Sequence, residues 1–172
     1  DGGLGYQEVT LAVVVDIAER GTASGVTSGE LVQREISERQ LVLEREQQQI
    51  KLLGQQQADA LRRKIADLER ELAQFEVEIR AQQSRLASSR NEFQRAEELF
   101  KDKFYSESKL IEFRNNVLDQ QVKVETLKRQ RAGVERELSA ARAEEPSIAL
   151  KTQTALEQIR ATIQAFAAKY PD

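Results

Sequence analysis

The chain has 172 residues, of which 32% are charged and only 5% are aromatic. This composition is typical of long helices and coiled coils, because a thick globular core needs more large apolar side chains. The 26 basic and 29 acidic residues are interspersed, which argues against nucleic acid or an anionic membrane as a partner. The sequence contains no Cys, His or Met, which excludes thiol nucleophiles, disulfides, His-ligated metals and a His general base.

Carboxylates are frequent, but on the outside of helices they are expected to be solvated partners of Lys and Arg rather than a catalytic pair. A seam between two helices also offers no concave pocket for a substrate. We therefore expect no enzymatic activity, no cofactor, no metal and no small-molecule substrate on this chain.

Residues 1–28 differ from the rest of the sequence. Residues 9–17 are rich in β-branched side chains and predict a short strand, which needs a partner strand to be stable. This strand is expected to be the remnant of a small β domain, followed by a Gly, Ser and Thr-rich linker. Thr27 or Ser28 is expected to cap a helix that starts near Glu30.

Residues 29–104 form the expected ascending arm. Its first part has a weak apolar seam, and a break is predicted near Gly54, where the phase of the stripe changes, although a helix could continue through this glycine at a cost of about 1 kcal/mol. Beyond the break, seam positions alternate in steps of four and three residues for nearly six heptads, which is a strong coiled-coil signal. The weak seam comprises Val32, Ile36, Leu43, Ile50 and Leu53. The strong seam comprises Leu61, Ile65, Leu68, Leu72, Phe75, Ile79, Gln82, Leu86, Ser89, Phe93, Ala96 and Phe100.

Residues 106–170 form the expected descending arm. A break is predicted at Pro146, because proline cannot continue an interior helix cleanly. The seam before this break comprises Leu110, Phe113, Val117, Gln120, Val124, Leu127, Arg131, Val134, Leu138 and Ala141. The seam after it comprises Thr152, Leu156, Ile159, Ile163, Phe166 and Tyr170.

Residues 101–106 separate the two arms and predict the tip of a hairpin. Ser106 is a good N-cap for the second helix, and a connection this short requires antiparallel neighbours. A turn centred on Lys103 pairs seam layers so that no polar residue faces another polar residue. The expected pairs include Phe93 with Phe113, Leu86 with Gln120, Gln82 with Val124, Leu72 with Val134, and Leu68 with Leu138. The fold class is thus all-α, a long antiparallel coiled-coil hairpin with interrupted arms, plus the short N-terminal β remnant.

The tip also carries Arg95, Leu99 and Ser106 in the spacing R-x3-L-x6-S. This spacing, at the expected turn, resembles the hairpin tip of the bacterial membrane fusion proteins, and most of all the HlyD-type periplasmic adaptors of type I secretion. By composition alone the motif is weak, but its coincidence with the turn strengthens it. The resemblance implies that these three residues dock on an outer-membrane channel.

The resemblance has further implications for the whole protein. It makes the strand at 9–17 the remnant of a split lipoyl-like domain, and the long arms resemble the adaptors that export peptides or bacteriocins more than those of multidrug efflux. A non-enzymatic adaptor of this family would lie in the periplasm, anchored in the inner membrane. Its partners would be a TolC-like channel, an inner-membrane ABC transporter and copies of itself, with which it would form a hexamer.

Two other interpretations remain open. The chain could be a structural coiled-coil scaffold whose turn has no channel partner. It could also form a parallel intermolecular dimer, which is disfavoured because the tethered second arm is present at an effective concentration on the order of mM.

Overall fold

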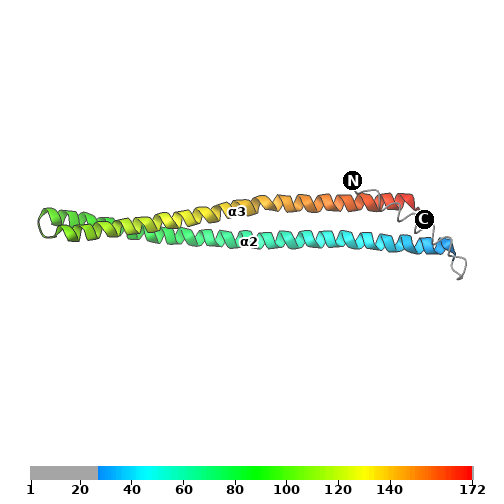
Figure 1. Cartoon of the computed structure of the whole chain (residues 1–172), viewed down its shortest axis with the longest axis horizontal. Helices are drawn as coiled ribbons and strands as arrows, with labels where there is room; N and C mark the ends of the chain where they lie inside the picture. Colours follow the sequence, from blue (N-terminus) through cyan, green and yellow to red (C-terminus); the bar gives the residue numbers. More distant parts are fainter. Residues whose placement is uncertain (1–26, 172) are drawn as a thin grey trace. The chain divides into compact units, whose positions relative to one another are not determined.

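The computed structural model describes residues 27–171, and within this range it contains two long helices and no strand. Helix α2 spans Ser28–Lys101 and helix α3 spans Glu107–Lys169, and a turn joins them (Figure 1). The all-helical prediction is therefore confirmed for these residues. The strand expected at 9–17 and most of the linker lie outside the described residues.

Helix α2 begins where the sequence predicts a cap. The backbone N–H of Glu30 donates to the Thr27 Oγ1 atom at 3.4 Å and to the Thr27 carbonyl at 3.0 Å. Glu30 also places a carboxylate in the first turn, near the positive end of the helix dipole. Thr27 is therefore the N-cap, as one of the two expected candidates.

The predicted interruptions of the arms are wrong. Helix α2 continues through Gly54, and helix α3 continues through Pro146. A glycine inside a helix costs about 1 kcal/mol and a proline about 3 kcal/mol. Each cost is local, whereas the helix on either side is held by several turns of buried seam, so the packing outweighs the local preference.

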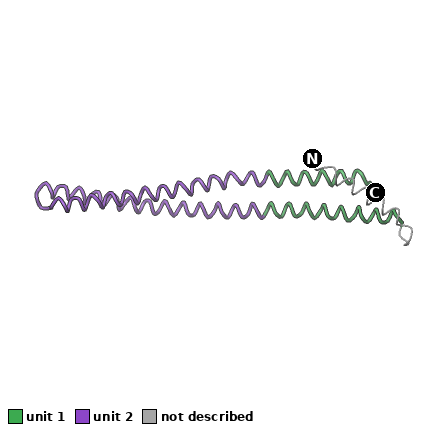
Figure 2. Tube along the Cα trace, in the orientation of Figure 1, with its two compact units in different colours: residues 1–55, 150–172 green, residues 56–149 purple. Residues whose placement is uncertain are grey.

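The described chain divides into two compact units, shown in different colours in Figure 2. Unit 1 contains the residues up to Gln55 and those from Leu150 onward, and unit 2 contains Gln56–Ala149. The boundary lies close in sequence to Gly54 and to Pro146. Each unit contains one stretch of α2 and one stretch of α3, and each is described separately below.

Unit 2 is an antiparallel helical hairpin whose two helices lie side by side (Figure 2). Its apolar cluster consists of the buried residues Leu61, Leu68, Val134, Leu138 and Ala141, with Ile65, Leu72, Phe75 and Ile148 packed against them. The expected pairs Leu68 with Leu138 and Leu72 with Val134 both fall in this cluster. Each fully buried aliphatic side chain contributes about 1.5–3 kcal/mol, so the cluster is a main source of stability for the hairpin.

The seam changes character between this cluster and the turn. Gln82 and Ser89 are buried, at 5% and 7% exposure, in a stretch of α2 whose other buried residues are Ile79, Leu86 and Ala96. The Gln82 amide donates to the Gln120 side chain, and Asn116 Nδ2 donates to Ser89 Oγ at 3.3 Å. The expectation that no polar residue faces another polar residue is therefore wrong, because Gln82 reaches Gln120 in the neighbouring layer and Asn116 reaches Ser89 from beside the seam.

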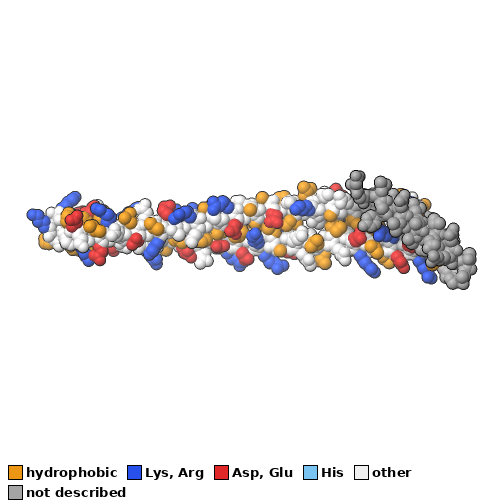
Figure 3. All heavy atoms as spheres, viewed as in Figure 1, with side chains coloured by type: hydrophobic (Ala, Val, Ile, Leu, Met, Phe, Trp, Pro, Cys, Tyr) orange, Lys and Arg blue, Asp and Glu red, His pale blue; other side chains and the backbone are white. Residues whose placement is uncertain are grey.

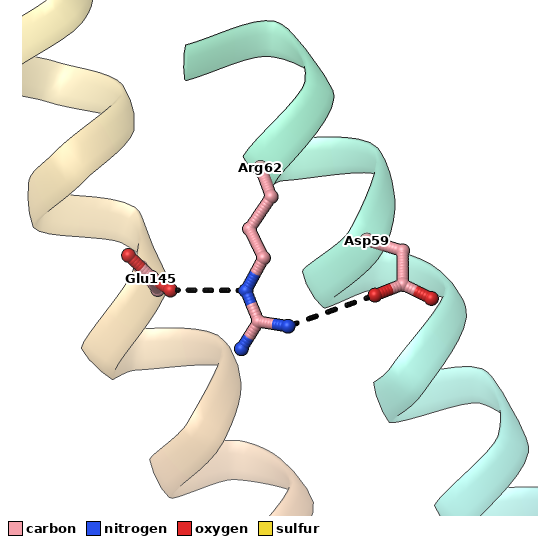
Figure 4. A network of polar contacts seen from close by, with 3 residues as sticks. All are labelled: Asp59, Arg62 and Glu145. Carbon is pink, nitrogen blue, oxygen red and sulfur yellow. Dashed lines mark hydrogen bonds and ion pairs between the residues drawn. The ribbon is translucent and has the colours of Figure 1, made fainter. Parts of the chain in front are cut away.

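Charged side chains of both signs are scattered over the exterior (Figure 3). In unit 2, Arg62 Nε lies 3.4 Å from Glu145 Oε1 on the other helix, and its Nη1 atom lies 3.7 Å from Asp59 (Figure 4). Arg142 on α3 similarly donates to Glu69 on α2 at 2.8 Å. All these side chains are largely exposed, so water screens their interactions and each pair adds little stability.

Replacing Arg62 with alanine is accordingly expected to change the free energy of unfolding by less than about 1 kcal/mol. Urea unfolding followed by circular dichroism measures this change. Gln56, an exposed polar residue of the same helix, provides a control when it is replaced with alanine. If Arg62→Ala lowered the free energy of unfolding by several kcal/mol more than the control, the exposed ion pairs would contribute more to stability than is expected of solvent-screened charges.

Unit 1 is held by a thinner seam. Leu43 is buried, and the partly buried side chains include Ile36, Ile50, Leu156, Ile159 and Ile163. Val32 and Leu53, which were expected in the seam, are exposed. Gly54 takes the buried position instead, and a Cβ atom built on it would lie 2.6 Å from both Oγ1 and Cγ2 of Thr152. The absence of a side chain at Gly54 therefore allows α2 and α3 to approach closely at this point.

Candidate functional site

The turn between the helices is built around Lys103, which has a positive φ of 65°. The Lys103 N–H donates to the Phe100 carbonyl at 3.0 Å, and the Phe104 N–H donates to the Leu99 carbonyl at 2.8 Å. This pair of hydrogen bonds is a Schellman motif, which satisfies carbonyls at the C-terminus of α2 that have no helical partner. The turn is centred on Lys103, as the sequence predicts.

Ser106 caps the second helix. Its Oγ atom accepts a hydrogen bond from the Lys109 N–H at 3.2 Å, and its carbonyl accepts one from the Leu110 N–H at 3.2 Å. Glu107 places a carboxylate in the first turn of α3. The Schellman motif and this cap together leave only a short non-helical segment, Asp102–Ser106, between the helices.

The structure places the three predicted docking residues at or near this turn. Arg95 is exposed and lies one helical turn before Leu99, which is partly buried. The Leu99 carbonyl accepts from both Phe104 and Tyr105, so its backbone belongs to the turn itself. Arg95 and Leu99 share a face of α2 because they are four residues apart. Ser106 lies on the other side of the turn and is exposed.

Aromatic side chains add to the tip in a way that the motif does not indicate. Among residues 27–171, Phe104 is the most exposed large apolar residue, at 76%. Tyr105 stacks on Phe113 with ring centroids 6.1 Å apart and planes within 8°, and the Lys109 ammonium lies 5.7 Å from the Phe113 centroid. Phe113 was expected opposite Phe93. The adjacent aromatic residues Phe104 and Tyr105, directly before the Ser106 cap, are the sequence signal that indicates this aromatic cluster.

The exposed side chains around the turn include basic, acidic, apolar and hydroxyl groups. Among residues 27–171, no group of three or more Asp, Glu, Cys or His side chains is arranged to hold a metal ion. No helix in the described part of the chain has both the length and the apolar character required to cross a bilayer.

Comparison with models of protein families, with curated proteins and with solved structures finds no match to this chain. A function is therefore inferred from the residues of the chain and from the hairpin that they form. The feature of the hairpin that bears most directly on function is the position of Arg95, Leu99 and Ser106 at the turn.

Replacing Lys103 with glycine is expected to raise the free energy of unfolding by about 1 kcal/mol, because the left-handed conformation is strained for a residue with a Cβ atom. Thermal or urea unfolding measures the gain. Lys101→Gly is the matched control, since Lys101 is helical and its replacement should cost about 1 kcal/mol. A loss of stability in Lys103→Gly would contradict the left-handed turn.

Proposed function

We propose that this chain is the hairpin region of an HlyD-type periplasmic adaptor. In this role the hairpin links an inner-membrane ABC exporter to a TolC-like outer-membrane channel for the secretion of proteins or peptides. The proposal places the chain in the periplasm, and it gives the chain no catalytic activity. Arg95, Leu99 and Ser106 are the residues that dock on the channel.

The observation that carries this proposal is the coincidence of the R-x3-L-x6-S spacing with the turn. The turn runs from Asp102 to Ser106, so the three residues of the motif lie within two helical turns of the place where the chain reverses. Elsewhere in such a helical chain, the same spacing would place the three residues in a row along one face of a helix, and they would not meet at the end of a hairpin.

Each of the three residues has a distinct chemical role in docking. The Arg95 guanidinium is exposed and donates hydrogen bonds to carbonyls or carboxylates at the helical turns of the channel. Leu99 supplies an apolar contact, and Ser106 fixes the direction in which α3 leaves the turn. A single tip buries little surface, so the affinity comes from several adaptor copies that bind one channel together.

A structural scaffold is the second candidate, and one observation favours it. The Ser106 hydroxyl already accepts the Lys109 N–H, so the cap explains Ser106 without any partner. Under this alternative the hairpin is a coiled-coil spacer, Arg95 is a solvated residue, and Leu99 packs at the end of the seam. The two candidates differ in whether the tip contacts another protein.

Site-specific photo-crosslinking in cells tests the proposal. A crosslinking amino acid at Arg95, Leu99 or Lys103 is expected to capture an outer-membrane channel protein, whereas the same group at the exposed Arg80, far from the turn along α2, is not. Mass spectrometry identifies the captured protein. Capture of no channel from any tip position would favour the scaffold.

Substitutions at the tip test whether these residues are needed for export. Arg95→Ala and Leu99→Ala are expected to abolish export while the helical content is retained, and Arg80→Ala serves as the matched control. Ser106→Asp keeps an N-cap and should therefore fold, which separates the capping role of this residue from a role of its hydroxyl in docking. Export that survives both Arg95→Ala and Leu99→Ala in a folded hairpin would contradict the docking role.

A further inference from the structure

Four polar side chains form a chain of hydrogen bonds across the seam of unit 2, between the apolar cluster and the turn. Gln82 donates to Gln120, Gln120 Nε2 donates to Asn116 Oδ1 at 3.5 Å, and Asn116 Nδ2 donates to Ser89 Oγ at 3.3 Å. We call this set, Gln82, Gln120, Asn116 and Ser89, the polar ladder. It links α2 to α3 twice, and its two members on α2 are the buried polar residues of the described chain.

Burial of these side chains is costly unless their hydrogen bonds are made. Gln82 is 5% exposed, so loss of its partner leaves an amide without water or protein to bond to. Apolar residues at the same positions would stabilise the seam without this requirement. The ladder therefore contributes less to stability than an apolar seam would, and its effect is to restrict which alignment of the helices is acceptable.

The apolar residues alone do not restrict how α2 and α3 are aligned. If α3 slips along α2 by one heptad in one direction, Phe75 faces Val124 and Leu72 faces Leu127. In the other direction, Ile79 faces Val134 and Phe75 faces Leu138. Apolar layers thus meet apolar layers in all three alignments, because both stripes repeat every heptad.

The ladder distinguishes the three alignments. A slip of one heptad would place Gln82 opposite Val117 or Arg131, and Gln120 opposite Ile79 or Phe93. When Gln82 lies opposite Arg131, Gln120 lies three layers away, so the link between the two glutamines is lost. When Gln82 lies opposite Val117, Gln120 stays in an adjacent layer, but Asn116 moves six residues away from the position opposite Ser89 and that link is lost. We propose that the polar ladder is a register lock, which fixes the alignment of α2 and α3 and thereby fixes which residues form the turn.

The register lock also determines which residues lie at the tip. A slip of one heptad moves the point of chain reversal by half a heptad, so Ser106 would no longer stand at the start of α3 and Lys103 would no longer be the central residue of the turn. The residues presented by the tip would then change, although the helices would still be packed. This inference does not depend on what the tip binds.

Disulfide trapping tests the register directly, since the chain has no cysteine of its own. Three cysteine pairs serve as reporters: Phe93→Cys with Phe113→Cys for the observed register, Leu86→Cys with Phe113→Cys for one slip, and Leu86→Cys with Leu127→Cys for the other. A slip of one heptad separates the wrong pairs by about 10 Å along the axis, which is beyond the reach of a disulfide.

The ladder is removed with Gln82→Met and Gln120→Met, which keep the length of the side chains and delete the amides, combined with Ser89→Ala, which deletes the acceptor of Asn116 Nδ2. A second variant, Gln82→Leu and Gln120→Leu with Ser89→Ala, repeats the test if the first does not fold. The matched control is Gln83→Met with Gln121→Met, because these neighbouring glutamines are exposed. Circular dichroism verifies helical content in every variant.

The expected result is a rise of roughly tenfold in the yield of at least one slipped pair when the ladder is removed, with thermal stability unchanged or higher. In the parent chain and in the control, only the pair Phe93→Cys with Phe113→Cys should crosslink efficiently. Two outcomes would overturn the register lock. One is a folded ladder variant that traps only the observed register, and the other is equal trapping of slipped pairs in the parent or the control.

Discussion

Replacing Gly54 with alanine is expected to lower the free energy of unfolding by about 1–3 kcal/mol, although alanine is the better helix former. The added Cβ atom would lie 2.6 Å from Oγ1 and Cγ2 of Thr152 and 3.2 Å from its Cβ atom. A rotation of the Thr152 side chain cannot remove the last of these contacts, because the Cβ position is fixed by the backbone. The helices of unit 1 must therefore separate locally.

Two further variants make this prediction specific. Gly133→Ala is the matched control, since the nearest atom to its added Cβ is the flexible Arg136 guanidinium at 3.9 Å, and it should gain about 1 kcal/mol in helix propensity. Thr152→Ala combined with Gly54→Ala should recover much of the loss, because only the contact at 3.2 Å remains. Denaturant unfolding of the single and double variants gives the coupling energy. Stabilisation by Gly54→Ala alone would show that the close approach does not exist.

Replacing Pro146 with alanine is expected to raise the free energy of unfolding by about 2–3 kcal/mol. Proline lacks the N–H that would donate to the Arg142 carbonyl, and its ring crowds that carbonyl, yet α3 continues through it. The Pro146 side chain is exposed, so alanine at this position removes the penalty without loss of buried surface.

Thermal unfolding by circular dichroism measures the effect of Pro146→Ala. Ser139→Ala, an exposed position on the same helix, is the control and should change stability by less than about 0.5 kcal/mol. The large difference between the two variants is the diagnostic result. If Pro146→Ala left stability unchanged or reduced it, α3 would have to be interrupted at this residue, as the sequence alone suggests.

The seams of the hairpin could be read from the sequence with few errors. Between Leu61 and Ala96, each position assigned to the stripe is buried or partly buried, and the same holds from Leu110 to Ala141. This success has a simple cause, since a narrow seam between two helices imposes one period on the sequence. The Ser106 cap and the turn at Lys103 were also predictable, because both are local.

The expected interruptions failed because local preference was given too much weight. Gly54 and Pro146 are unfavourable in a helix by an amount that can be estimated from their chemistry, but the packing that opposes them depends on residues far away in the sequence. In the same region the apolar pattern predicts Leu53 rather than Gly54 in the seam, because a large apolar residue is the usual occupant of a seam position. The reverse is true in the structure, where the space available beside Thr152 admits only glycine without a shift of the helices.

The polar ladder and the aromatic tip were missed for a different reason. Pairing the layers strictly face to face places Gln82 against Val124 and Gln120 against Leu86, and in that scheme no amide meets another. Glutamine side chains are long enough to bond diagonally to the adjacent layer, so the length of the side chain decided the contact. The exposure of Phe104 follows from the Schellman turn, which the apolar period does not describe.

The apolar cluster and the polar ladder of unit 2 together constrain the relative lengths of its two helical arms. The apolar cluster joins Leu68 to the region of Leu138, and nearer the turn Gln82 bonds to Gln120. If one heptad were deleted from α2 between these contacts and the polar ladder kept its alignment, Leu68 would lie opposite Arg131 instead of Leu138. The same deletion made in both helices would restore both. The hairpin can therefore be shortened or lengthened by whole heptads in matched pairs, and its two arms are constrained to change in length together.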